Sequence, residues 1–257
     1  MSKPIVFVAL ISLSISLIAN EYSFRKYEHV KSFYSELTLS AIKVSKKNKL
    51  PAAAILAIAG LESGYGSGYV SQITGNILSL GAFKGDNELP ALYIPYSKSL
   101  KKVLFDPNEI KKHSKQDLVY KKRPKSYKRD YRPAPYAGTA NKLELLKYNK
   151  ELRFKAQKAC LNDFATRWIK IDSNIKAFRE SRVWLNKEIK DNGVSILNSM
   201  GLNIVFINKI GGIKNSFNYR KTWPKKVELI MKKVGLVQLV NSIVNEKMSF
   251  NEAWESK

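Results

Sequence analysis

The chain has few of the side chains that most often form a catalytic or metal site. Its 257 residues include one cysteine, Cys160, and two histidines, His29 and His113. A single cysteine excludes an intramolecular disulfide, and its position between Ala and Leu predicts a small buried side chain on a helix. Neither histidine stands in a triad or at metal-ligand spacing. We therefore expect no thiol chemistry, no metal site and no cofactor.

Acidic residues are also scarce. The chain has 21 Asp and Glu against 45 Lys and Arg, a formal net charge of +24. Such a surplus attracts a polyanion, or else forms a solvated surface that keeps the protein soluble. In a cytosolic protein the polyanion would be nucleic acid. In an exported protein it would be the carboxylates and phosphates of the cell envelope, and we expect these rather than nucleic acid.

The N-terminus carries an apolar run that is short for a membrane span. Lys3 supplies a positive charge, and Ile5 to Ala19 is uncharged, a pattern typical of a signal peptide. The residues before Ala19 make a poor cleavage site, so an N-terminal anchor is the alternative. We interpret residues 1–20 as a signal peptide or anchor, and we expect an exported protein of the periplasm or cell envelope.

The rest of the chain has ordinary hydrophobic content, 44%, which favours a folded and mainly helical protein. Apolar residues spaced three and four apart predict a helix over 24–48, and Phe178, Val183, Trp184 and Ile189 mark another. Further helices are expected over 141–159 and 224–244, and 196–210 is another apolar stretch. The alternation in Arg167 to Ser173 predicts a strand, with Asp172 or Ser173 capping the next helix.

Glu62 ends a stretch that is otherwise uncharged. From Pro51 to Leu61 the chain has no charged residue, which predicts a buried helix, and glycines at 64, 66 and 68 end it and open a loop. Glu62 is therefore expected where a buried helix meets a cleft. Burial disfavours the charged form of a carboxyl group, and a glycosidase general acid must keep its proton near neutral pH. A solvated acid at a helix end is the alternative.

Three segments resemble the glucosaminidase family of peptidoglycan hydrolases, which has a lysozyme-like fold. They are Leu61-Glu62-Ser63-Gly64-Tyr65-Gly66, Gly75-Asn76-Ile77-Leu78 and the later Tyr219-Arg220-Lys221-Thr222-Trp223-Pro224. The family typically shows Leu-Glu-Ser-Gly-Trp-Gly, Asn-Leu-Phe-Gly-Ile-Lys and Tyr-Ala-Thr-Asp-Pro. The resemblance covers residues 30–97 and 165–235. Tyr65 replaces the family's Trp, and Trp223 stands at its Asp.

The resemblance implies a mainly α, α+β lysozyme-like fold: a helical catalytic domain with a small β-lobe and a basic insertion. Residues 21–97 would form the first part of the domain with the catalytic helix, and 161–257 the remainder with the C-terminal helices. The insertion, 98–160, is rich in Lys, Arg and Tyr. Such a pattern can bind a glycan or single-stranded nucleic acid, or it can be a surface loop.

The resemblance also implies an endo-β-N-acetylglucosaminidase, with Glu62 as general acid. The second catalytic group is less defined: Asp86 and Glu88 lie in the loop after the Gly-Asn motif. Either can activate water or stabilise positive charge. A plain loop acid is the alternative for both, and the acetamido group of the substrate can also supply the second function.

Four further residues are candidates for binding the sugar. Tyr65 keeps an aromatic ring at the cleft, and Asn76 holds either its own loop or an N-acetyl group. Tyr93 follows in a segment that we expect to line the cleft as a short strand or extended edge, with Pro95 excluding a central strand. The resemblance gives Tyr219 the role of positioning the sugar or the water; a core tyrosine is the alternative.

Three functions follow. The first is an exported peptidoglycan hydrolase without amidase activity, which cleaves β-1,4 bonds next to N-acetylglucosamine. The second is a lytic transglycosylase, which closes the sugar on itself and leaves anhydromuramic ends. The third is a non-catalytic cationic protein that binds the cell wall or nucleic acid. We expect a monomer whose partners are peptidoglycan glycan strands and the anionic surface of the envelope.

Overall fold

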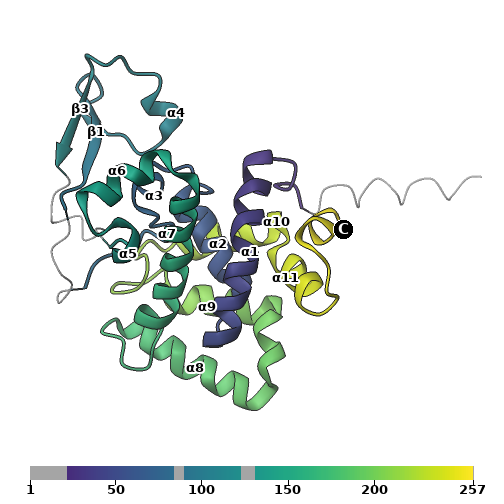
Figure 1. Ribbon diagram of the computed structural model, residues 1–257. Coiled ribbons are helices and arrows are strands. Elements are labelled where there is room, and N and C mark those ends of the chain that lie inside the picture. The colour runs from purple at the N-terminus through teal and green to yellow at the C-terminus, as the bar shows by residue number, and fades with distance from the viewer. Residues whose placement is uncertain (1–21, 84–89, 123–130, 257) are drawn as a thin grey trace, which may run out of the picture.

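The computed structural model describes residues 22–83, 90–122 and 131–256. The fold is mainly helical with one small antiparallel sheet, as the sequence predicted (Figure 1). The helices of the first half are α1 Glu28–Asn48, α2 Ala52–Ser63, α3 Tyr69–Thr74, α4 Pro107–Ile110, α5 Ala134–Ala137, α6 Ala140–Tyr148 and α7 Lys150–Asp163. Those of the second half are α8 Lys176–Asn192, α9 Met200–Ile210, α10 Trp223–Val234, α11 Leu236–Val244 and α12 Phe250–Glu255.

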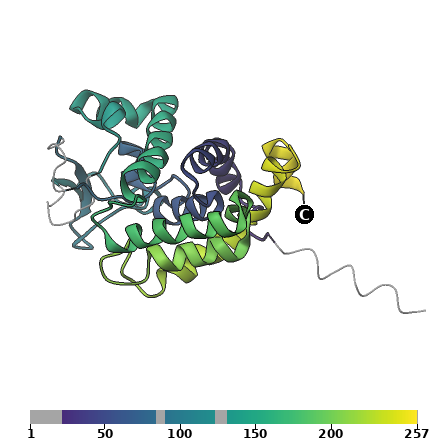
Figure 2. The same cartoon turned by 90° about the horizontal axis from the view of Figure 1, so that it is seen from below.

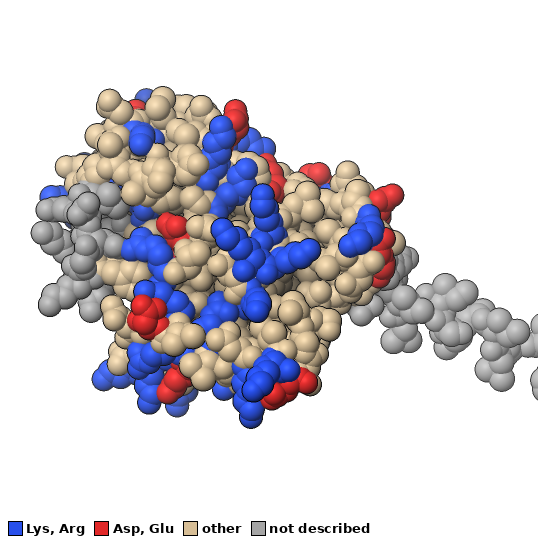
Figure 3. Space-filling view, turned by 60° about the horizontal axis from the view of Figure 1, so that its bottom comes forward, with Lys and Arg blue, Asp and Glu red and all other residues tan. Residues whose placement is uncertain are grey.

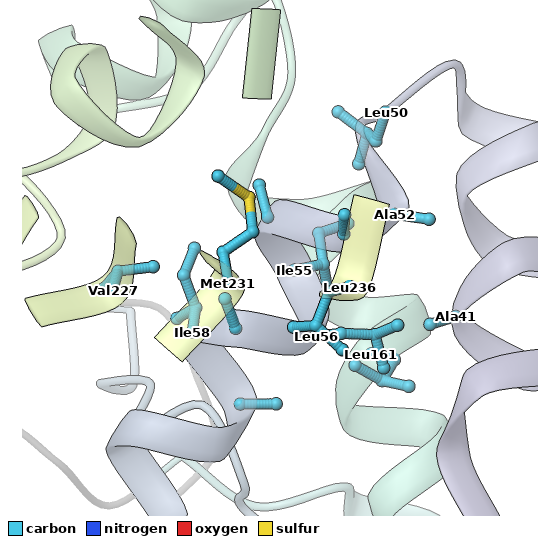
Figure 4. Packing of buried hydrophobic residues seen from close by; sticks show 14 of the residues in the cluster. Ala41, Leu50, Ala52, Ile55, Leu56, Ile58, Leu161, Val227, Met231 and Leu236 are labelled. Carbon is cyan, nitrogen blue, oxygen red and sulfur yellow. The ribbon is translucent and has the colours of Figure 1, made fainter. Parts of the chain in front are cut away.

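Helix α2 is the centre of the core. All of its residues except Leu61 and Glu62 are buried, and it packs against α1, α9, α10 and α11. A helix that is apolar on every face needs neighbours all around it, which these four helices provide. Figure 4 shows Ile55 and Ile58 of α2 among the side chains of the surrounding helices, including Met231 of α10.

The start of α2 is completed by a distant side chain. Pro51 precedes the helix and makes no side-chain cap, so the first backbone N–H groups need other acceptors. Asn203 of α9 supplies one: its Oδ1 accepts a hydrogen bond of 2.9 Å from Ala54 N. Its Nδ2 donates to the carbonyls of Leu197 and Ser199. This buried amide therefore ties α2 to the segment around α9.

The sheet is a small lobe with the order β2-β1-β3, formed by Tyr93–Ser97 (β1), Lys102–Val103 (β2) and Leu118–Lys122 (β3). The expectation that Pro95 excludes a central strand was wrong, because β1 lies in the middle. The Pro95 carbonyl accepts from Leu104 N at 2.9 Å on the β2 side, but β2 pairs only with Tyr96 and Ser97. Pro95 therefore stands beyond the end of β2, where no ladder hydrogen bond from its nitrogen is needed.

The strand predicted over 167–173 is absent. Helix α7 instead continues into a π-helical turn, Phe164–Trp168. A strand face would bury alternate residues together, but Ile169 is 1% exposed and Ile171 is 60% exposed. The predicted cap was also misplaced, since Ile175 precedes α8 without a side-chain cap and Ser173 Oγ only accepts a long bond from Ile175 N.

The other predicted helices are confirmed, with two breaks. The stretch 141–159 divides at Asn149, whose side chain caps α7. Residue 160, where a boundary between segments was expected, lies inside α7, which packs on α1. The stretch 224–244 divides at Gly235, which adopts a left-handed conformation. The second half also holds a short 3-10 turn, Val194–Asn198.

The two ends of the described chain are fastened together. The Arg25 guanidinium donates to the carbonyls of Val234 and Ser256, both at 2.8 Å, and lies over the rings of Tyr22 and Trp254. Figures 1 and 2 place this junction and the sheet at opposite ends of the molecule. The apolar run 5–19 lies outside the described residues, and no helix within them is long and apolar enough to cross a membrane.

Candidate active site at the end of helix α2

The Ser-Gly-Tyr-Gly segment turns the chain sharply away from α2. Gly64, Tyr65 and Gly66 all have positive φ, at 55°, 54° and 75°, a conformation that favours glycine. Ser63 holds this turn, because its hydroxyl donates to Ala59 O at 2.6 Å and accepts from Gly66 N at 2.7 Å. The turn leaves Glu62 on the last turn of the helix, facing open space.

Glu62 is half-buried and hydrogen-bonded to the indole of Trp223. Trp223 Nε1 donates to Glu62 Oε1 at 2.7 Å, across 161 positions of sequence. The backbone of Glu62 is held as well, because Ser79 Oγ donates to its carbonyl at 3.3 Å. No hydrogen bond joins Oε2 to any other residue of the described ranges. The carboxyl group is therefore fixed through one oxygen, and the other is free.

Trp223 is fixed in its turn by tight packing. Its side chain is 3% exposed, and its ring stacks on Phe217 with centroids 5.1 Å apart. Gly211 lies directly against the indole: a Cβ atom at that position would come within 2.2 Å of Trp223 Cε3 and Cζ3. This packing holds the indole where its Nε1 meets Glu62.

Glu62 opens onto a cleft of about 1050 Å³. Aromatic side chains supply much of its wall. The lining residues include Glu62, Tyr69, Val70, Asn76, Ser79, Leu80, Phe83, Phe105, Phe217, Tyr219, Arg220, Trp223 and Lys226. Glu62 is the only acid among the described residues that line this cleft. Burial raises the pKa of the Tyr69 phenol to about 12, so this hydroxyl stays neutral at physiological pH.

The Gly-Asn motif holds the loop below the cleft. Gly75 has φ 72° and no room for a side chain, since a Cβ atom would come within 2.4 Å of Ala156 Cβ on α7. Asn76 is buried, and its amide donates to the carbonyls of Leu80 and Tyr131 at 3.0 and 2.9 Å. Its Oδ1 accepts from Leu80 N at 3.0 Å. Of the two roles predicted for Asn76, the contacts are those of a loop-holding residue.

The structure brings some of the predicted sugar-binding residues to the cleft and not others. Tyr219 lines it and is 68% exposed. Tyr65 does not, because its ring packs edge-on against Phe33 and Tyr34 of α1. Tyr93 is half-exposed on β1, outside the residues that line the cleft.

The candidates for a second carboxylate, Asp86 and Glu88, lie outside the described residues. They follow closely in sequence on Phe83, which lines the cleft.

The sequence predicted a small buried Cys160 on a helix, and the structure confirms that position. Cys160 is buried on α7, and burial raises the pKa of its thiol to about 12. His113 Nδ1 pairs with Asp117 Oδ2 at 2.6 Å in the β-lobe, and Ser97 Oγ donates to the same carboxylate at 2.7 Å. Within residues 22–83, 90–122 and 131–256, no group of three or more His, Cys, Asp or Glu side chains could hold a metal ion.

The residue that the sequence did not assign is Trp223. In the sequence, Trp223 stands where the resembled family has Asp, and this difference gave it no role. One signal for it exists in the sequence: a tryptophan directly before Pro224, at the first turn of a helix, with two glycines twelve and eleven positions earlier. That pattern indicates an indole packed against bare backbone, although it does not reveal the partner.

Comparison of the chain with protein-family models, with characterised proteins and with solved structures returned no match.

Proposed function

We propose that the protein is an exported glycoside hydrolase that cleaves the β-1,4 bonds of peptidoglycan next to N-acetylglucosamine. The observation that carries the proposal is the setting of Glu62: one carboxyl group at the end of a buried helix, in an aromatic cleft, fixed by Trp223 at 2.7 Å. Glycoside cleavage needs a proton delivered to the leaving oxygen. Aromatic side chains suit the apolar faces of sugar rings.

The Trp223 contact favours one oxygen of Glu62 as the carrier of the proton. An indole N–H is a donor only, so Oε1 must accept from it and cannot present a proton to it. A carbonyl oxygen accepts better than the hydroxyl oxygen of an acid, so in the acid form this contact favours the proton on Oε2, the oxygen without a partner among the described residues. A general acid needs a proton held at a fixed place within hydrogen-bond reach of the leaving group. The Trp223–Glu62 pair provides such a place.

The second half of the reaction has two candidate sources. In the hydrolase, water attacks with help from a carboxylate such as Asp86 or Glu88, or from the acetamido group of the substrate. In a lytic transglycosylase, the sugar closes on itself and one acid suffices. Glu62 is the one acid among the described residues that line the cleft, and the lytic transglycosylase is the alternative function.

The lysozyme-like fold and the envelope location belong to the same proposal. A helical body with a small sheet beside a cleft, and one acid at the end of a buried helix, supports the fold. The charge supports the location: Lys and Arg side chains gather on the face in Figure 3, where acidic side chains are few and scattered. Such a surface is attracted to an anionic envelope, and salt weakens the attraction.

Digestion of peptidoglycan by the purified protein tests the proposal. The new chain ends are identified by mass spectrometry, with Glu62→Gln beside the wild type. We expect reducing N-acetylglucosamine ends that disappear in the variant. Anhydromuramic ends lost in the same variant would assign the protein to the transglycosylases. Binding without any new ends, in both proteins, would contradict an enzymatic function.

A further inference from the structure

One wall of the cleft comes from a stretch of chain without a single acid. From Gly193 to Val227 there is no Asp or Glu, while six cations are present: Lys209, Lys214, Arg220, Lys221, Lys225 and Lys226. Two of the six, Arg220 and Lys226, line the cleft in which Glu62 lies. Local positive charge in a cleft raises the local concentration of anions.

Arg220 and Lys226 are not used in ion pairs within the described residues. On α10, the helix that carries Lys226, Lys232 pairs with Glu228 at 2.6 Å. No described carboxylate lies within salt-bridge distance of Arg220 or Lys226, and both side chains are exposed. The Arg220 guanidinium lies 5.8 Å from the centroid of the Tyr219 ring, beside a ring that also lines the cleft. These two cations are therefore available to a ligand.

Apart from Glu62, the rest of the described lining is uncharged. Tyr69, Val70, Phe83 and Phe105 belong to it. A ligand that fits both parts of the lining carries uncharged sugar rings as well as negative charge. N-acetylglucosamine has no charge, whereas the lactyl group of N-acetylmuramic acid bears a carboxyl group, either free or extended by a peptide with carboxylates of its own.

We propose that Arg220 and Lys226 form a subsite for the carboxylates of the glycan strand, so that the cleft distinguishes carboxylate-bearing glycan from neutral glycan. The inference rests on the proposed function, since it names the substrate feature read by the same cleft. Cations at an exposed cleft wall act mainly on selectivity and on association. The selectivity disappears when the two cations are removed, while the acid chemistry of Glu62 stays in place.

The test compares the full chain with the double variant Arg220→Gln, Lys226→Gln on three substrates. These are a neutral β-1,4 N-acetylglucosamine oligosaccharide, glycan strands stripped of peptide so that the lactyl carboxylates are free, and strands that retain their peptides. The matched control is Lys221→Gln, Lys225→Gln, which removes the same charge from the same segment at two residues that do not line the cleft.

We expect the cleft variant to lose about tenfold in kcat/KM on carboxylate-bearing glycan, the effect of two exposed ion pairs. Its kcat/KM on the neutral oligosaccharide stays unchanged, which also shows that the variant folds. A loss on stripped strands assigns the lactyl carboxylate, and a loss confined to peptide-bearing strands assigns the peptide carboxylates. An equal loss on the neutral substrate, or an equal loss in the control, would overturn the subsite.

A binding titration separates this inference from the proposed function. In the Glu62→Gln background, affinities for the neutral and the stripped glycan are measured at low and high salt. We expect a preference for the stripped glycan that decreases with salt and is absent when Arg220 and Lys226 are also changed. Equal affinities in the Glu62→Gln protein would overturn the subsite. A wild type that cleaves no substrate but keeps the preference would contradict only the enzymatic function.

Discussion

The two walls of the cleft are held by different kinds of contact. The loop wall, residues 75–83, depends on hydrogen bonds: Asn76 ties it to Leu80 and Tyr131 through both ends of its amide. The helix wall, the start of α10 with the residues just before it, depends on close packing: Trp223 packs against Phe217 and Gly211. One wall is uncharged and the other carries Arg220 and Lys226.

The two walls contact different parts of Glu62. Glu62 stands between the two walls and contacts both, through Ser79 Oγ at its backbone and Trp223 Nε1 at its carboxyl group. Only the helix wall reaches the reactive oxygens. We therefore expect changes at Trp223 and the residues packed on it to affect catalysis, and changes at Asn76 to affect mainly the stability of the loop.

The largest effect beyond Glu62 itself is expected for Trp223→Phe. This change removes the Nε1–H donor but keeps an aromatic ring, so the carboxyl group loses its fixed orientation. A hydrogen bond to a carboxyl group contributes about 1–3 kcal/mol, which corresponds to a loss of about tenfold to a hundredfold in kcat/KM. Steady-state kinetics on glycan strands measure it.

Trp184→Phe is the matched control, because Trp184 lies on α8 outside the residues that line the cleft. It should leave kcat/KM unchanged. If Trp223→Phe is as active as this control, the indole does not position Glu62.

A smaller effect is expected for Gly211→Ala. The added methyl group would meet Trp223 at 2.2 Å, while the backbone itself is extended at φ −145° and accepts any residue. Overpacking of this kind costs about 1–3 kcal/mol of unfolding free energy. Because the indole must shift, kcat/KM falls as well. Denaturant unfolding and kinetics on one preparation measure both.

Gly201→Ala serves as the comparison for Gly211→Ala, since a Cβ atom at Gly201 meets nothing within 4 Å. Alanine suits a helix better than glycine by about 0.5–1 kcal/mol, so this variant should be as stable as the wild type or slightly more so. Equal stability of the two alanine variants would show that the indole is not confined by Gly211.

The smallest effect concerns Cys160, behind the loop wall, where its Sγ lies 3.7 Å from Asn76 Oδ1. Burial raises the pKa of the thiol to about 12, so at pH 8 only about one thiol in ten thousand is ionised. We expect no reaction with an aromatic disulfide reagent in the native protein and complete reaction in denaturant. Rapid labelling of the native protein would show that this wall opens.

The sequence was sufficient for the local features of the site. The uncharged stretch from Pro51 to Leu61 predicted the buried helix, and the glycines after Glu62 predicted where it ends. Both follow from the preferences of neighbouring residues. The same local reasoning failed at 167–173, where alternation favoured a strand but α7 and the core imposed a helical turn.

Contacts between distant segments were beyond such reasoning. The Trp223–Glu62 hydrogen bond joins residues 161 positions apart, and no periodicity in the sequence relates them. Tyr65 is a second residue whose contacts the sequence did not reveal. Its residue type predicted a ring at the cleft, but its left-handed backbone, φ 54°, directs the ring to Phe33 and Tyr34.

The central claim is that Glu62 supplies the proton, and its most direct test is to measure cleavage and binding on the same Glu62→Gln protein. Glutamine keeps the shape and can still accept from Trp223 Nε1, but it has no acidic proton to donate. We expect the rate of glycan cleavage to fall by about 10²–10⁴-fold while the Kd for glycan strands stays the same. Cleavage at the wild-type rate would show that Glu62 is not the acid.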